Sequence, residues 1–208
     1  MTAQTIIHVI EDDDELRLSL DSLFRSVGFA TRLYKDAGAF QPQALCDEPS
    51  CLVVDVRLPG LSGLDFQDQL IRIGVSIPIV MMTGYGDVPM TVRAMKAGAI
   101  DFLPKPFRDQ DMLDAVSTGI SRDRQRRERE GDLVSLKHRF DELSEREKQV
   151  MALVTAGLMN KQVAGRLSIS EVTVKIHRRS AMQKMEAKTL ADLIKMSESL
   201  RLGRISNG

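Results

Sequence analysis

Residues 51–55, CLVVD, and residues 77–82, IPIVMM, are short runs in which almost every side chain is apolar. Such runs are typical of parallel β-strands that helices cover on both faces. Similar runs recur through the first 120 residues and are separated by amphipathic stretches. The expected strands are 6–10, 30–34, 51–55, 78–82 and 100–103, and the expected helices are 14–27, 36–44, 64–73, 88–97 and 110–120. This alternation predicts an α/β fold with a doubly wound, five-stranded parallel sheet.

Polar side chains follow the expected strands at the edge where parallel strands end. Glu11 and Asp12 follow the first strand, and the others are Asp55, Thr83 and Lys105. Ligands of doubly wound sheets bind at this edge, so we expect these groups to converge. Clustered carboxylates repel one another unless a cation neutralises them, and an all-oxygen ligand set suits Mg²⁺. An aspartate beside a metal ion, a hydroxyl and an ammonium can act as a nucleophile toward phosphorus.

The acidic run at residues 11–14 also has a plainer interpretation, in which its side chains cap the following helix and interact with its dipole. For Asp13 and Asp14 we favour that interpretation. Taken alone, Asp12, Thr83 and Lys105 would also be explained as capping, turn or surface residues. Their coincidence at one sheet edge is what favours a reaction site.

The chain has 208 residues and no formal net charge, but its charge is distributed unevenly. Residues 1–120 contain 17 acidic and 10 basic residues, whereas residues 121–208 contain 12 acidic and 19 basic residues. This asymmetry indicates two domains, an acidic one that suits a cation and a basic one that suits a polyanion.

The composition also excludes several classes of protein. Two cysteines are too few for a disulfide framework, and with three scattered histidines they are too few for a Cys/His metal site. No stretch approaches 18 apolar residues, and the N-terminal residues have no basic region before the first apolar run. We therefore expect no membrane span, no signal peptide and a cytoplasmic location.

Residues 5–120 resemble the receiver domain of bacterial two-component response regulators. The matching motifs are Glu11-Asp12 after the first strand, VVDVRLPGLSG at 53–63, MMTGYGD at 81–87 and AGAIDFLPKPF at 97–107. The resemblance implies a flavodoxin-like fold in which Asp55 accepts a phosphoryl group from the phosphohistidine of a sensor histidine kinase. It also implies that the chain is no enzyme beyond this self-phosphotransfer and a slow autodephosphorylation.

The receiver resemblance implies a role for each group at the sheet edge. The residues implied to bind Mg²⁺ are Asp12 and Asp55 directly, Glu11 through water, and Arg57 through its backbone carbonyl. The residues implied to bind the phosphoryl oxygens are Thr83 and Lys105. The bond between Lys105 and Pro106 is expected to be cis, as is usual in this family.

The same resemblance identifies Phe102 as the switch aromatic, a position at which many relatives carry Tyr. Phosphorylation of Asp55 would draw the Thr83 hydroxyl inward, and Phe102 would pack into the vacated space. The affected surface would consist of the 88–97 helix, the fifth strand and the 110–120 helix. A plain core role for Phe102 is the alternative.

Residues 122–139 combine many charged side chains with good helix formers, which predicts a solvated helical linker with a natural break at Gly131. Nonspecific binding of nucleic acid by this run is the less favoured alternative, because acidic residues are interspersed in it. The expected domains are the receiver at 1–121, this linker at 122–139 and a DNA-binding domain at 140–208.

Residues 140–208 are expected to form an all-α domain of four short helices. Ser144 and Glu147 form a capping box, and Gly157 ends the helix that follows. Asn160 is expected to cap the second helix and Ser170 the third. Two short helices joined by the tight turn at 168–170 indicate a helix-turn-helix.

The third helix of this domain has two different faces. Its expected buried stripe consists of Val174, His177, Ala181 and Met185. Lys175 and Arg179 lie on the opposite side, with Ile176 and Arg178 beside them. A helix with an apolar back and a cationic front fits the major groove. On spacing alone, a merely solvated basic face explains the cations equally well.

Residues 143–196 resemble the LuxR-type helix-turn-helix of FixJ/NarL-type regulators, from the capping box through Asn160-Lys161, Ile169-Ser170 and Thr173-Val174-Lys175. The resemblance implies that the domain binds duplex promoter DNA. The implied base contacts are Lys175, Ile176 and Arg179, and the implied phosphate contacts are Lys161, Thr173 and Arg178. The implied dimer contacts on the fourth helix are Leu190, Leu193 and Ile194.

Together the two resemblances identify the chain as a FixJ/NarL-type response regulator that is phosphorylated, forms a homodimer and regulates transcription by RNA polymerase, with activation favoured. The resting receiver either occludes the DNA-binding or dimer surface or merely fails to dimerise; both interpretations stay open. An aspartyl-phosphate hydrolase is disfavoured, because Arg57 stands where such an enzyme needs an acid/base carboxylate. A phosphorylation-independent regulator and an RNA-binding output are further alternatives.

Overall fold

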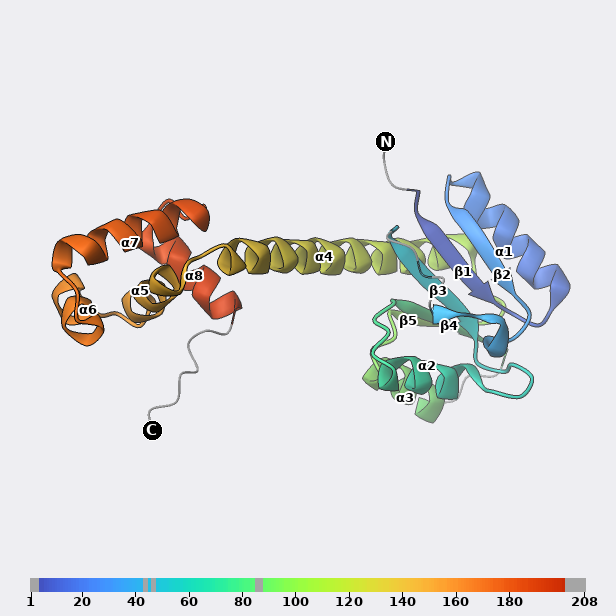
Figure 1. The fold of residues 1–208 in the computed structure, drawn as a ribbon. Helices are drawn as coiled ribbons and strands as arrows, with labels where there is room; N and C mark the ends of the chain where they lie inside the picture. Colours follow the sequence, from blue (N-terminus) through green and yellow to red (C-terminus); the bar gives the residue numbers. More distant parts are fainter. Residues whose placement is uncertain (1–3, 43–44, 46–47, 85–87, 201–208) are drawn as a thin grey trace. The chain divides into compact units, whose positions relative to one another are not determined.

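The computed structural model describes residues 4–42, 45, 48–84 and 88–200 (Figure 1). The chain divides into two compact units, Met1–Arg127 and Glu128–Gly208, which we call the first unit and the second unit. Each unit has its own hydrophobic core, and each is described by itself.

The described residues of the first unit form one five-stranded parallel sheet with strand order β2-β1-β3-β4-β5. The strands are β1 (Ile6–Ile10), β2 (Ala30–Tyr34), β3 (Ser50–Asp55), β4 (Ile79–Thr83) and β5 (Asp101–Pro104). In the register of β1 and β3, Ile10 is aligned with Val54. Glu11 and Asp55 each follow an aligned residue, so both belong to the same sheet edge. The predicted α/β parallel-sheet fold is confirmed.

Helices cover both faces of this sheet (Figure 1). The helices are α1 (Asp14–Ser26), α2 (Gly63–Arg72), α3 (Val88–Lys96) and the first part of α4 (Asp109–Asp141). One core layer joins the strands to Leu64, Phe66 and Leu70 of α2 and to Ala94 of α3. The other core layer joins them to Leu20 and Phe24 of α1 and to Met112 and Val116 of α4. Alternate residues of the central strands face the two layers, which explains why most of their residues are apolar.

The expected helix at 36–44 is wrong for the residues described there. A short 3-10 turn, Ala37–Ala39, occupies this stretch, and the Asp36 side chain accepts a hydrogen bond from the Ala39 backbone N–H at 2.9 Å. Gly38 and Pro42 explain the difference, because glycine and proline disfavour a longer helix. Residues 43 and 44 lie outside the described part of the chain.

The expected helix break at Gly131 is also wrong, since α4 continues through this residue to Asp141. One glycine destabilises a helix interior by only about 1 kcal/mol. The charged and aliphatic residues on both sides are good helix formers, and Leu136 and Leu143 bury their side chains in the core of the second unit. That packing stabilises the end of the helix more than the glycine weakens it.

In the described residues of the second unit, which end at residue 200, the end of α4 is followed by four short helices. They are α5 (Glu145–Thr155), α6 (Asn160–Leu167), α7 (Glu171–Lys184) and α8 (Leu190–Ser199). The predicted capping box of Ser144 and Glu147 is confirmed, and Ser170 caps α7. The predicted cap at Asn160 is wrong: the N-cap of α6 is Met159, whose backbone N–H donates to the Gln162 side chain at 2.8 Å. No helix in the described residues is long and apolar enough to span a bilayer.

His8 lies inside the first unit, among aromatic side chains of the layer that faces α2. Its ring Nδ1 lies 3.1 Å from the Tyr34 hydroxyl, its ring stacks on that of Tyr34, and the Phe40 ring meets it edge-on. Burial, and then the nearby positive charge of Arg32, lower the pKa of His8 from its ordinary value of 6.5 to about 4. His8 is therefore neutral in the folded protein at neutral pH.

Replacing His8 with Phe should flatten the pH dependence of the stability of the first unit. Between pH 6.5 and 4 the unfolded chain binds a proton at His8 that the folded chain does not, so the free energy of unfolding falls as the pH is lowered. This one group contributes a slope approaching about 1.4 kcal/mol per pH unit inside that window. Urea unfolding at pH 7, 6 and 5 measures this slope. Tyrosine fluorescence reports the unfolding of the first unit, because both tyrosines of the chain belong to that unit.

The matched control is His138→Gln, because His138 is an exposed histidine of the second unit. This variant should keep the wild-type slope. A His8→Phe variant that also keeps the wild-type slope between pH 7 and 5 would contradict the assignment of the proton uptake to His8.

Candidate functional site

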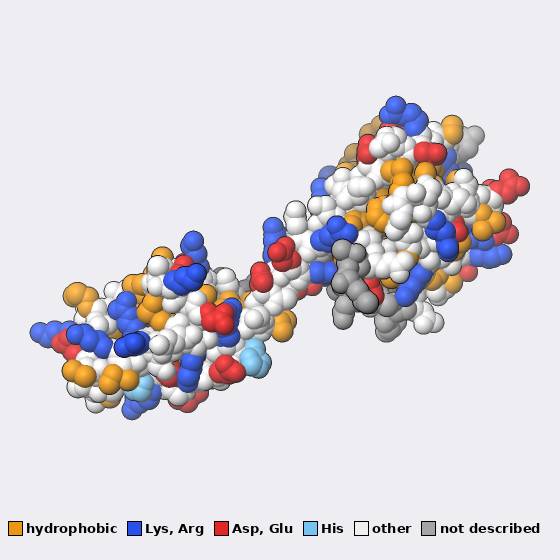
Figure 2. All heavy atoms as spheres, turned by 90° about the horizontal axis from the view of Figure 1, so that it is seen from above, with side chains coloured by type: hydrophobic (Ala, Val, Ile, Leu, Met, Phe, Trp, Pro, Cys, Tyr) orange, Lys and Arg blue, Asp and Glu red, His pale blue; other side chains and the backbone are white. Residues whose placement is uncertain are grey.

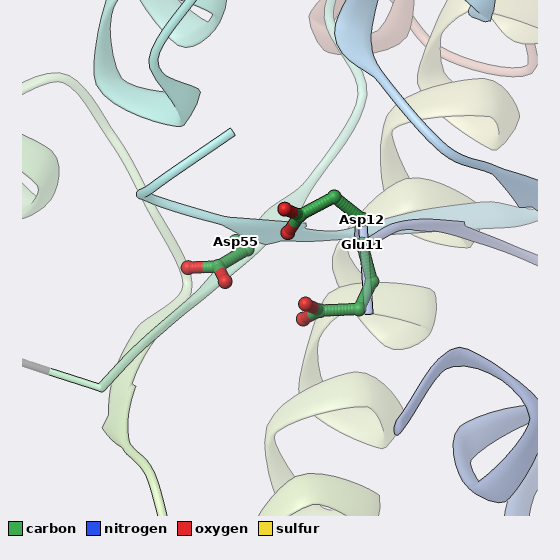
Figure 3. Close-up of side chains that lie close together, drawn as sticks. All are labelled: Glu11, Asp12 and Asp55. Carbon is green, nitrogen blue, oxygen red and sulfur yellow. The ribbon is translucent and has the colours of Figure 1, made fainter. Parts of the chain in front are cut away.

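Three carboxylates meet at the sheet edge where β1 and β3 end. Glu11 and Asp12 follow β1, and Asp55 is the last residue of β3. Figure 3 shows their side chains directed into a common space, and each offers an oxygen that lies within 4.8 Å of the others. Glu11 and Asp55 are buried, whereas Asp12 is exposed to solvent. The site is therefore negatively charged, partly desolvated and open on the side of Asp12.

Lys105 brings a positive charge into this cluster from the segment after β5. Its Nζ lies 2.6 Å from Glu11 Oε2 and 2.6 Å from Asp55 Oδ2. Its backbone N–H donates to the Thr83 carbonyl at 2.7 Å, and the Lys105–Pro106 bond is cis, as expected. The lysine thus bridges the two buried carboxylates, which would otherwise repel each other at close range.

The pKa values of these groups reflect burial and mutual charge. Burial raises the pKa of Glu11, and the charge of Asp55 adds to that effect, although hydrogen bonds from Lys105 and Asp13 oppose it. Burial lowers the pKa of Lys105, but its hydrogen bonds to Asp55 and Glu11 outweigh this, so the pKa is raised overall. The Lys105 ammonium therefore stays charged between the two buried carboxyl groups.

This donor set fits a small divalent cation. Mg²⁺ prefers oxygen ligands, keeps several waters, and is usually held by one or two carboxylates. Glu11, Asp12 and Asp55 supply carboxylate oxygens close together, and the exposure of Asp12 gives an ion access from solvent. The backbone N–H of Arg57 donates to Asp55 Oδ1 at 3.0 Å, which fixes the start of the following loop against the carboxylate.

The remaining residues predicted for this site lie on the neighbouring strands β4 and β5. Thr83 is the last residue of β4 and is fully buried. Phe102 lies in β5, where it is aligned with Met81 of β4, and its half-buried ring packs against the core layer that faces α2 and α3. The structure therefore places Asp55, Thr83 and Lys105 at one sheet edge. Phe102 lies on β5, the strand that pairs with β4.

Arg17 of α1 is a buried part of the site that the sequence analysis missed. Only 7% of the residue is exposed, and its Nη1 donates to the Glu11 carbonyl at 2.8 Å and to the Asp12 carbonyl at 3.5 Å. Its Nη2 donates to the Asp14 carboxylate. The signal in the sequence is an arginine three residues before Leu20 and seven before Phe24, on the apolar face of the helix. Arg17 holds the backbone from which two of the three acidic side chains project.

Gly63, the first residue of α2, also supports the site. A Cβ atom added to it would lie 2.2 Å from the backbone oxygen of Asp55, closer than atoms can approach. Its backbone N–H donates to the Val56 carbonyl at 2.9 Å. The close approach of α2 to the end of β3 therefore requires a residue without a side chain at position 63.

The Arg17→Met substitution should weaken Mg²⁺ binding by roughly 10–100-fold, a range typical for partners that orient metal ligands. The variant loses the donors that hold the Glu11 and Asp12 backbone, while the aliphatic part of the side chain still fills its place. Calorimetric titration of the full-length chain with MgCl₂ measures the change.

Arg25→Met on the same helix is the control, because Arg25 is exposed and pairs only with Asp21 in the described contacts. It should bind Mg²⁺ like the wild type. Equal affinities for Arg17→Met and Arg25→Met would show that Arg17 does not organise the acidic cluster.

In the second unit, α7 shows the two faces expected from its sequence. Val174, Ala181 and Met185 are fully buried, and His177 is half-buried. The exposed residues on the other side include Lys175, Ile176 and Arg179. Figure 2 shows Lys and Arg side chains spread over the surface of this unit, which is the lobe on the left.

The expected phosphate contacts lie beside this exposed face. Lys161 is exposed on α6, and Arg178 Nη1 donates to the Asn160 side chain at 3.3 Å. The Thr173 hydroxyl lies 2.8 Å from that of Ser170, the N-cap of α7. The helix-turn-helix thus presents its cations from both α6 and α7.

Glu147 connects α5 to α7 and so fixes the orientation of α7 in the unit. Its carboxylate accepts hydrogen bonds from the Ser180 hydroxyl at 2.6 Å, the Lys184 Nζ at 2.8 Å and the Ser144 backbone N–H at 2.7 Å. Burial opposes ionisation, but these hydrogen bonds outweigh it and lower the pKa of Glu147 to about 2. The same glutamate therefore caps α5 and anchors α7.

One of the residues expected to contact a second copy does not lie on the surface. Leu193 of α8 is fully buried and packs with Met151, Ala181 and Met185 in the core of the second unit. This corrects the expectation that its side chain forms a dimer surface, because exposing it would open the core. Ile194 is half-buried, and Leu190 packs against the neighbouring core cluster.

Comparison with protein families gives two matches. Residues 7–117 match the response regulator receiver domain, and residues 141–197 match the luxR family of bacterial regulatory proteins. The first match lies in the first unit and the second match in the second unit.

Individual proteins are similar over nearly the whole chain. Nodulation protein W of Bradyrhizobium diazoefficiens is 55% identical over 199 residues, which cover 96% of this chain and 88% of that protein. The structure of response regulator StyR matches with a TM-score of 0.81 and 45% identity over 94% of this chain and 99% of that one. Full-length FixJ from B. japonicum matches with a TM-score of 0.58 and 38% identity over 99% of this chain and 100% of that one.

Proposed function

Because this chain belongs to the bacterial two-component response regulators that join a receiver domain to a LuxR-family DNA-binding domain, we propose that it is a phosphorylation-dependent transcription regulator. A sensor histidine kinase transfers a phosphoryl group to Asp55, and the phosphorylated chain forms a homodimer that binds promoter DNA. The observation that carries this proposal is the convergence of Asp55, Glu11, Asp12 and Lys105 at one sheet edge.

The proposed reaction begins at the Asp55 carboxylate. One of its oxygens forms a bond to phosphorus while the bond between phosphorus and the kinase histidine nitrogen breaks, and that nitrogen keeps the electron pair. Lys105 Nζ already lies 2.6 Å from Asp55 Oδ2. The Lys105 ammonium can therefore bind an oxygen of the new phosphoryl group and neutralise part of its charge. The Thr83 hydroxyl is proposed to donate to a second phosphoryl oxygen.

The acidic cluster is proposed to hold Mg²⁺ during this transfer. Asp12 and Asp55 would bind the ion directly, Glu11 through water, and Arg57 through its backbone carbonyl. When bound, Mg²⁺ would supply positive charge that stabilises the transferring phosphoryl oxygens. Lys105 pairs with both Glu11 and Asp55, which limits the repulsion between these two carboxylates.

Phosphorylation is proposed to reach the protein surface through packing. When Thr83 moves toward the phosphoryl group, Phe102 can turn into the space that the hydroxyl leaves, because Phe102 on β5 is aligned with Met81, two residues before Thr83 on the adjacent strand β4. The exposed side of α3 carries Val88, Val92 and Met95. These apolar side chains lie four and three residues apart on one helix face, so they offer a surface on which two receivers can pair.

The second unit is proposed to bind duplex DNA through α7. Lys175, Ile176 and Arg179 would contact base edges in the major groove. Lys161, Thr173 and Arg178 would contact phosphates, and Leu190 and Ile194 on α8 would contribute to the dimer. A dimer binds two half-sites at once, and this bivalence raises its affinity without any new contact.

The proposed domains are the receiver at 1–121, a helical linker at 122–139 and the DNA-binding domain at 140–208. The bound dimer is proposed to act on RNA polymerase, with activation favoured over repression. The chain would thus be a regulator, with phosphotransfer to itself and slow autodephosphorylation as its only chemistry. Since bacterial promoters lie in the cytoplasm, this function places the chain there.

A small phosphodonor with Mg²⁺ should raise the affinity of the full-length chain for its operator on the order of a hundredfold, because dimerisation makes binding bivalent. The Asp55→Asn variant should not respond, because it lacks the accepting carboxylate. Fluorescence anisotropy with a duplex selected from a random library measures the affinity, and sedimentation velocity measures the dimer.

Asp132→Asn is the matched control, because it removes an exposed carboxylate of the second unit, far along the chain from the site. It should respond like the wild type. Equal operator affinity of the wild type with and without the phosphodonor would contradict the proposal. So would a full response by Asp55→Asn.

A further inference from the structure

We propose that Val172 and Ile176 of α7 form a methyl-reading pair that recognises two thymines in the major groove of the operator. This inference rests on the proposed function, since it requires that α7 enters duplex DNA. It adds Val172 to the residues that read bases and assigns a ligand group, the thymine 5-methyl, to each member of the pair.

Exposure of apolar side chains in the second unit is concentrated on the helix-turn-helix. The large hydrophobic side chains that its described residues expose are Val134, Met159, Val172 and Ile176. Val134 lies on α4, whereas Met159 caps α6 and the other two lie on α7. Val172 is 66% exposed and Ile176 is 61% exposed, so little of either side chain is buried in the core of the unit.

Helical geometry places the pair on the face that opposes the core. An α-helix turns by about 100° per residue. The residues that fall within one arc of about 100° on α7 are therefore Val172, Lys175, Ile176 and Arg179 and, near the C-terminal end of the helix, Gln183. The buried stripe of Val174, Ala181 and Met185 lies on the opposite side. Thr173 and Arg178 lie about 60° beyond the two ends of the arc, one on each side, which agrees with roles at the phosphates.

The chemistry of this arc repeats along the helix, because each apolar residue is followed three positions later by a cation. Val172 precedes Lys175, and Ile176 precedes Arg179. In the major groove, guanine presents the N7 and O6 acceptors that a cation can bind, and thymine presents a methyl group that suits an aliphatic side chain. The N-terminal residues of a recognition helix are those that contact base edges, and Val172 is the second residue of α7.

The spacing of the pair predicts the spacing of the thymines. Four residues advance about 6 Å along a helix axis. Successive base pairs are stacked about 3.4 Å apart. For a helix that follows the groove, Val172 and Ile176 therefore match two methyl groups that are about two base-pair steps apart.

Duplex DNA is a better partner for this face than a second copy of the chain. Lys175 and Arg179 lie between and beside the two apolar side chains and are themselves exposed. Two such faces brought together would place like charges in contact, which destabilises an interface. The negative charge of DNA complements the same cations.

The test replaces thymine by uracil, which removes only the 5-methyl group. The operator is selected from a random duplex library with the full-length chain, a small phosphodonor and Mg²⁺. Each thymine of one half-site is then replaced in turn, and the affinity of every duplex is measured for the wild type, Val172→Ala, Ile176→Ala and the control Val134→Ala. Val134 is 67% exposed and lies outside the helix-turn-helix, so it matches Val172 in residue type and exposure.

Two thymines, about two base-pair steps apart, should each lose roughly three- to tenfold in wild-type affinity when the methyl group is removed. At one of them the loss should disappear in Val172→Ala, and at the other it should disappear in Ile176→Ala. Val134→Ala should show both losses in full. A uracil profile for Val172→Ala that equals that of Val134→Ala would overturn the inference for Val172 while leaving DNA binding by α7 intact. Failure of the library to yield any preferred duplex would overturn the proposed function itself.

Discussion

The ammonium of Lys105 between the carboxylates of Glu11 and Asp55 is the interaction on which the site of the first unit depends. The β1–β3 pairing brings two buried acids to one sheet edge, where their charges repel. A lysine from the segment after β5 offsets that repulsion, while exposed Asp12 leaves the cluster open to a further cation. A site built in this way has paired buried carboxylates and also the solvent access that the proposed binding of Mg²⁺ and of a phosphoryl group requires. Arg17 binds the backbone carbonyl of Glu11, and Gly63 allows α2 to approach the backbone of Asp55 closely. The same residues therefore support both the fold and the acidic cluster.

In the second unit, α7 is held firmly on one side, while its opposite face stays exposed to solvent. Glu147 anchors α7 through Ser180 and Lys184, and the buried stripe seats the helix on the core. The opposite face keeps both its cations and two aliphatic side chains in solvent. An exposed aliphatic pair contributes little to the stability of the fold. Burial of its apolar surface by a partner therefore contributes to the free energy of binding.

The sequence predicted the features that depend on short, regular patterns. All five strands were found from apolar runs, and the acidic cluster was found because parallel strands end at one edge. The helix expected at 36–44 failed because amphipathic spacing could not outweigh Gly38 and Pro42. The break at Gly131 and the surface role of Leu193 failed because tertiary packing decides both. Arg17 was missed since a buried arginine is recognised only when its carbonyl partners are known.

The most direct test of the account is to locate the phosphoryl group. The full-length chain is incubated with acetyl phosphate and Mg²⁺, and its peptides are sequenced by tandem mass spectrometry under conditions that preserve acyl phosphates. The account predicts one phosphoryl group, carried by the peptide that contains Asp55 and absent when Mg²⁺ is chelated. A chain that carries no phosphoryl group, or carries it on a residue outside the cluster of Glu11, Asp12 and Asp55, would contradict it.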